Sequence, residues 1–150
     1  MNKALLLALA LAVIPITDDA QVSDLEQTRA LAEQGNALAQ WRLGVMYDNG
    51  EGVPEDDAEA VRWYRLAAEQ GLVPAQFNLG VKYANGRGVP QDYVLAYMWW
   101  NLAAAQEHEG PYEGARTNKA AIEKRMTREQ IAEAQRLSRE WIEAHPPDGN

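Results

Sequence analysis

Residues 48–57, DNGEGVPEDD, combine glycines with carboxylates, as phosphate-binding and calcium-binding loops do. A phosphate loop needs a lysine and a serine or threonine after its last glycine, whereas acidic residues follow here. A calcium loop needs oxygen ligands at alternate positions. The related stretch at residues 84–93, ANGRGVPQDY, lacks them, because Ala84 and Arg87 replace the first two acidic residues. We therefore interpret both loops as structural turns.

Few other side chains could act in catalysis or bind a metal. The only serines are Ser23 and Ser138, and the chain has no cysteine. His108 lies between two glutamates and would bind a metal only weakly, and its distance from His145 does not fit a metal-ligand pair. At the end of a predicted helix, His145 complements the helix dipole instead. We predict no catalytic, cofactor-binding or metal-binding residue.

Three adjacent carboxylates, Glu55, Asp56 and Asp57, are the remaining candidates for acid–base chemistry. Paired carboxylates catalyse such reactions when their environments move their pKa values apart. No neighbour in the sequence provides such an environment. We expect a solvated acidic run at the start of a helix.

Composition and charge limit the partners of this chain. Its 150 residues suffice for one domain with a hydrophobic core. The formal net charge of −8 argues against nucleic acid as a partner, because a phosphate backbone requires a basic surface. It also disfavours binding to an anionic membrane surface.

The first twenty residues have the pattern of a secretory signal peptide. Lys3 precedes an apolar run that ends at Pro15 and has about half of the ~20 residues that span a bilayer. We place cleavage after Ala20, although Asp18 fits the preference for small residues poorly. The alternative is an uncleaved anchor or an amphipathic start. A mature domain at residues 21–145 would then be exported, to the periplasm or beyond the cell, with no membrane span.

A tandem repeat of 36 residues follows. Residues 35–70 and 71–106 align without a gap and are identical at 19 of 36 positions. Within each unit, the apolar residues recur at the spacing of two amphipathic helices. Gly44 recurs in mid-helix, where it costs about 1 kcal/mol against alanine, which indicates that a neighbouring helix approaches closely.

The loop inside the first repeat fits a helix-to-helix connection. Gly50 stands where a left-handed residue ends a helix, and Val53 is expected to fill the gap between the two helices. Asp56 then caps the second helix, with Glu59 completing a capping-box pattern.

These patterns predict an all-α protein of helix pairs without a sheet. A capping helix pair at 111–145 follows the two repeats, and residues 146–150 are expected to form a disordered tail. We expect helices near residues 24–34, 38–49, 56–70, 74–85, 92–106, 113–126 and 128–145.

The repeats resemble the Sel-one-like repeat (SLR) family, a relative of the tetratricopeptide repeat with a longer internal loop. Residues 39–68 and 75–104 match its pattern, A-x-x-x-L-G-x-x-Y-x-x-G-x-G-V-x-x-D-x-x-x-A-x-x-W-x-x-x-A-A, at every fixed position. The resemblance implies a short α-solenoid of antiparallel helix pairs that binds proteins or assembles complexes. Some cysteine-rich members are linked to β-lactam binding, which this cysteine-free chain is not expected to share.

The resemblance also implies that the first helix of each pair lines a concave surface. There the sequence places a row of apolar residues rimmed by polar ones, which suits a groove for an extended or helical peptide. The predicted partner-binding residues are Trp41, Arg42, Val45, Phe77, Asn78, Val81 and Lys82. The alternative is that these residues are buried against neighbouring helices.

The predicted function is that of an exported protein-interaction module whose protein or peptide partner is unidentified. Two other functions remain open: a hydrolase of cell-wall or β-lactam amides, and a structural subunit of a larger complex. No serine or histidine pairs with a base at a spacing typical of hydrolases.

Overall fold

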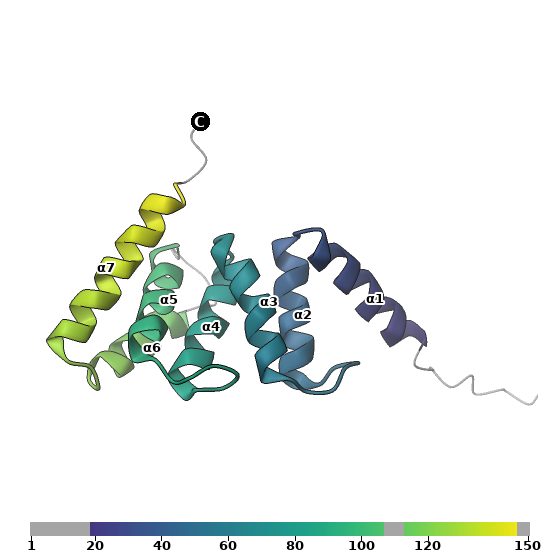
Figure 1. Ribbon diagram of the computed structural model, residues 1–150, viewed down its shortest axis with the longest axis horizontal. Helices are drawn as coiled ribbons and strands as arrows, with labels where there is room; N and C mark the ends of the chain where they lie inside the picture. The colour runs from purple at the N-terminus through teal and green to yellow at the C-terminus, as the bar shows by residue number, and fades with distance from the viewer. Residues whose placement is uncertain (1–18, 107–112, 147–150) are drawn as a thin grey trace, which may run out of the picture.

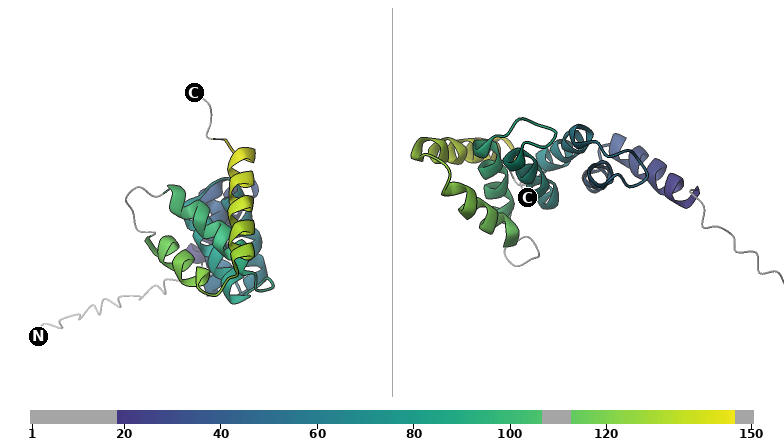
Figure 2. Two further views of the ribbon diagram at one scale, coloured as in Figure 1. Left: turned by 90° about the vertical axis from the view of Figure 1, so that its left-hand side faces the viewer. Right: turned by 90° about the horizontal axis from the view of Figure 1, so that it is seen from below.

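The structure, a computed structural model, describes residues 19–106 and 113–146. These residues form seven α-helices and no strand, which confirms the predicted all-α solenoid. Helices α1 to α5 follow one another in chain order along the long axis, while α6 and α7 both lie against α5 (Figures 1 and 2). Their bounds are α1 Asp19–Glu33, α2 Ala37–Asn49, α3 Asp57–Glu69, α4 Val73–Asn85, α5 Tyr93–Gln106, α6 Glu113–Glu123 and α7 Arg128–Ala144.

The helix bounds agree with the sequence to within a few residues, except at the first helix. Helix α1 begins at Asp19 rather than near residue 24, so the expected cleavage point after Ala20 lies in its first turn. The rest of the predicted signal peptide lies outside the described residues. So do His108 and most of the predicted tail.

The helix pairs pack closely because glycines remove side chains from their interfaces. α2 packs on α3 and α4 on α5, while α3 joins the two pairs by packing on α4. A Cβ atom on Gly44 would lie 2.6 Å from the Tyr64 ring, and one on Gly80 would lie 2.5 Å from the Trp100 indole. These contacts confirm the close approach expected from the repeated mid-helix glycine.

The loop inside the first repeat is a helix-to-helix turn. Gly50 ends α2 in the left-handed region, at φ +69°, and Val53 packs on the hydrophobic cluster between α2 and α3. The Asp56 side chain accepts hydrogen bonds from the backbone N–H groups of the first turn of α3. Glu59 does not complete the expected capping box. Its carboxylate accepts hydrogen bonds from Arg62 instead.

The last two helices both rest on α5. Trp141 of α7 packs edge-on against Trp99, and its indole N–H donates to Glu69 at 3.0 Å. On α6, Gly114 faces the ring of Phe77, to which an added Cβ would come within 3.2 Å. These contacts place α6 beside α4, next to the predicted partner-binding residues.

Candidate partner-binding surface

Three pockets follow one another along the first helices of the pairs. The first, of about 630 Å³, lies between α1 and α2 and is lined by Arg42 and Val45. The second, of about 180 Å³, is lined by Phe77, Asn78 and Val81 of α4 together with Asp48 at the end of α2. The third, of about 250 Å³, lies between α4 and α6 and includes Val81 again.

Most of the predicted partner-binding residues therefore line a pocket. Val45 and Val81 occupy the same position in successive repeats, and both are half-buried. Arg42 is more exposed, with 57% of its side chain accessible, and forms an ion pair with Asp24 across the first pocket. Asn78 is half-buried in the second pocket.

The two aromatic residues differ in their surroundings. Trp41 is half-buried against the hydrophobic core, lines none of these pockets, and its indole N–H is buried without a hydrogen-bond partner. Phe77 is also half-buried, but it lines the second pocket while its ring packs against Gly114 of α6. Groove and core are therefore not exclusive alternatives, since Phe77 contributes to both.

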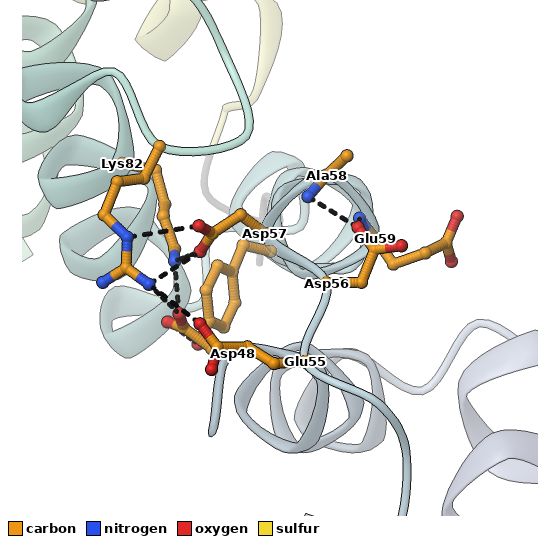
Figure 3. A network of polar contacts seen from close by, with 9 residues as sticks. Asp48, Glu55, Asp56, Asp57, Ala58, Glu59 and Lys82 are labelled. Carbon is orange, nitrogen blue, oxygen red and sulfur yellow. Dashed lines mark hydrogen bonds and ion pairs between the residues drawn. The ribbon is translucent and has the colours of Figure 1, made fainter. Parts of the chain in front are cut away.

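Lys82 lines the second pocket as well, but its side chain is only 3% exposed. It occupies the position of Met46 in the first repeat, so its aliphatic stem enters the core. A buried ammonium group requires compensating charge. The carboxylates of Asp48 and Asp57 converge on it and accept its hydrogen bonds (Figure 3).

Asp57 also departs from the expected solvated acidic run. Besides Lys82, its carboxylate contacts the guanidinium of Arg87, 3.1 Å away, from the loop of the second repeat. The hydrogen bond from Lys82 lowers the pKa of Asp57 below its ordinary value of 3.8, against the opposing effect of burial. Glu55 pairs with Arg87 as well, at 3.4 Å. This ion-pair network joins the two repeats, and its members Asp48, Lys82 and Arg87 line the second pocket.

Tyr64 extends the network into the core. Its hydroxyl donates to the carboxylate of Asp48 at 3.0 Å. Burial raises the pKa of Tyr64, and the negative charge of Asp48 raises it further, so the phenol stays protonated and remains a donor. The end of α2 is thereby fixed to both α3 and α4.

The differences between the two repeats contained a signal for this network. Arg87 replaces Glu51, Lys82 replaces Met46, and Asp57 has no acidic counterpart in the second repeat. Positive charges gained in the second repeat thus meet negative charges of the first. An alignment of the two repeats that considers only their identical positions misses this charge complementarity.

Two further candidates for chemistry, Ser138 and His145, are engaged in structural contacts. Ser138 is buried and its hydroxyl donates to the carbonyl of Ala134, while His145 stacks on Trp141 with ring centroids 4.2 Å apart. Within the described ranges, no group of three or more potential ligand residues could hold a metal ion. None of the helices described is long and apolar enough to cross a bilayer.

A fourth pocket, of about 560 Å³, lies between α5 and the C-terminal end of α7. Leu102, Trp141 and His145 are among its lining residues. None of the predicted partner-binding residues lines it, so the three pockets along α2, α4 and α6 are the candidate surface.

Comparison with known proteins agrees with this architecture. The sequence matches the Sel1 repeat family over residues 37–72 and 73–108. No curated protein matches the chain. Among solved structures, a protective antigen of uropathogenic Escherichia coli with an SLR fold is 35% identical over 88% of this chain, with a TM-score of 0.80.

A Sel1 repeat protein from Oxalobacter formigenes is 41% identical over 55% of this chain, with a TM-score of 0.55. The chain spans 28% of the length of the Escherichia coli protein and 63% of that from Oxalobacter formigenes. Two tandem Sel1 repeats therefore form the centre of this chain, and its fold is that of the SLR family.

Proposed function

We propose that this chain is an exported, non-catalytic module that binds a protein or peptide partner along α2, α4 and α6. The observation that carries the proposal is the series of three pockets, in which Val45 and Val81 repeat with the period of the sequence. Sel1 repeats support protein–protein interaction as the general function. The pockets support our placing the interaction along these three helices.

The pockets suit the side chains of one peptide segment. Each combines an apolar wall with polar groups: Val45 with Arg42 in the first pocket, and Val81 with Asn78 in the second. In such interfaces a few buried apolar side chains supply most of the binding energy, while polar groups at the edge set register. The repeat makes the pockets a series rather than one isolated cavity.

The test of this surface is capture of a partner from cell-envelope extract by immobilised protein. We expect the double variant V45A/V81A to retain its fold, because two half-buried valines lose only small side chains. Its capture of the partner should fall at least tenfold, a change of about 1.4 kcal/mol.

Leu66→Ala provides a matched control, because Leu66 is an exposed apolar residue of α3, 43% accessible, that lines none of the three pockets. It should capture as the wild type does. Equal capture by V45A/V81A would reject the pocket series as the binding surface. A partner that co-purifies in fixed stoichiometry and never exchanges would instead favour a structural subunit, and turnover in a hydrolysis screen would favour an amidase.

Export is supported by the residues that precede α1. Lys3 and the apolar run after it predict a signal peptide. Protein recovered from cells should begin near Gln21 and be found in the periplasm or the medium. N-terminal sequencing of fractionated cells measures this, and an intact Met1 or Asn2 on cytoplasmic protein would disprove export.

A further inference from the structure

Helix α6 and the turn after it concentrate positive charge in an acidic chain. Residues 113–128 contain five lysines and arginines against two glutamates, although the formal net charge of the whole chain is −8. By contrast, residues 48–59 contain six carboxylates and no basic residue. Along the candidate surface, the excess charge therefore changes from negative in the loop of the first repeat to positive at α6.

Three of these five cations, Lys119, Lys124 and Arg125, are not neutralised by a carboxylate of the described residues. Lys119 donates to Asn101 at 3.0 Å and lies over the ring of Tyr97, and Arg125 lies over the ring of Tyr93, 5.1 Å from its centroid. Neither they nor Lys124 form an ion pair within the described part of the chain.

Of the five lysines and arginines in the two repeats, all but Arg65 pair with a carboxylate, and Arg65 donates to the hydroxyl of Tyr83. Arg42, Lys82 and Arg87 each contact at least one carboxylate within 4 Å. Surface cations ordinarily gain little from such pairs. In residues 113–128, by contrast, cations outnumber carboxylates by five to two, and this excess creates a positive potential that an anionic partner would experience.

The third pocket lies directly beside these cations. Its apolar lining includes Val81, Trp100 and Ile122, and Arg125 stands at its edge. Val81 also lines the second pocket. The third pocket and the cations beside it therefore continue the surface on which the proposed function rests. A ligand here would meet an apolar cavity and unpaired positive charge together.

We propose that the partner segment bound on α4 and α6 is an acidic peptide. An apolar side chain of the peptide fills the third pocket, and aspartates or glutamates beside it face Lys124 and Arg125. Glu51 and Asp56, which form no ion pair in the described part of the chain, disfavour peptide carboxylates near the first loop, so the acidic part of the peptide lies toward α6. Charge complementarity of this kind sets orientation and association rate more than total affinity.

The probe is a fluorescent 12-residue peptide that repeats Leu-Glu-Asp, compared with a peptide in which Gln and Asn replace the acids. Fluorescence anisotropy measures both affinities at two salt concentrations. The acidic probe should bind at least tenfold more tightly than the amide probe, and the difference should shrink as salt rises. In K124E/R125E the affinity for the acidic probe should fall at least tenfold.

Arg139→Glu is the matched control, since Arg139 is an exposed, unpaired arginine on α7 outside the three pockets. It changes the net charge in the same direction and should leave the affinity nearly unchanged. Because Arg125 packs on Tyr93, a second variant, K124E/R128E, carries the same charge change without disturbing that ring. Thermal melts establish that each variant is folded.

Equal binding of the amide probe, or an equal loss in Arg139→Glu, would overturn the assignment. So would an acidic probe that neither binds nor competes with a partner captured by the wild type. That last result would leave the proposed function standing, whereas normal capture by V45A/V81A would remove the proposed function itself. The two failures are therefore distinguishable.

Discussion

Gly88→Ala is expected to destabilise the protein by at least about 3 kcal/mol, more than any other loop glycine substitution. Gly88 adopts φ +72°, and an added Cβ would lie 2.2 Å from the carbonyl oxygen of Asp57 and 2.9 Å from the backbone nitrogen of Ala58. Backbone atoms in the first turn of α3 cannot move aside as a flexible side chain can. The loop must withdraw, and Arg87 would then leave Asp57.

Gly52→Ala is the matched control, because Gly52 holds the same position in the first repeat and nearly the same φ, +71°. Its added Cβ would meet only the end of Met46, at 3.9 Å. It should cost about 1–2 kcal/mol from backbone strain alone. Thermal melts should separate the two variants by roughly 5 °C or more. Identical melting would show that the loop does not rest tightly on α3.

The second large effect is expected for Lys82→Met. The variant gives the second repeat the residue that the first repeat has at this position, so its volume fits the core. It leaves the carboxylates of Asp48 and Asp57 close together without the buried ammonium that compensates them. Breaking a buried ion pair on one side costs about 3 kcal/mol, which denaturant unfolding should detect.

The pH dependence of stability provides an independent readout of the same ion-pair network. Because folding lowers the pKa of Asp57, its contribution is fully present above its ordinary pKa of 3.8 and is lost as the pH falls through the lower folded value. Lys82→Met should therefore flatten the acid side of the stability curve.

In the double variant D57N/K82M, part of the lost stability should return, because only one of the two carboxylates that faced the Lys82 ammonium remains. A Lys82→Met protein with wild-type stability and a wild-type acid transition would mean that Lys82 is not a structural cation. The expected loss also makes Lys82 unsuitable as a test of binding.

The fold was predictable because the information for it is local and repeated. Gly50 and Asp56 specify the end of one helix and the start of the next, and the period of 36 residues sets the helix pairs beside each other. Val45 and Val81 could be assigned to one face from helical spacing alone, and both line pockets.

The details of the site depend on contacts that helical spacing does not contain. Asp48 and Lys82 are 34 residues apart, and only the stacking of two repeats brings them together. The position of Phe77 depends on Gly114, which follows a segment without a counterpart in the repeats. From the sequence alone, the charge of Lys82 predicts an exposed side chain. Its burial can be predicted only when its partners Asp48 and Asp57 are known.

The most direct test of the central claim, that a partner binds along α2, α4 and α6, is the footprint of the captured partner in amide hydrogen exchange. The protein with its partner is compared with the free protein, peptide by peptide. Binding in the pockets should slow exchange in α4 around Asn78 and Val81, and in α2 around Val45, while the exposed side of α3 near Leu66 stays unchanged. Protection confined to α3 and α5, with α2 and α4 unaffected, would contradict the account.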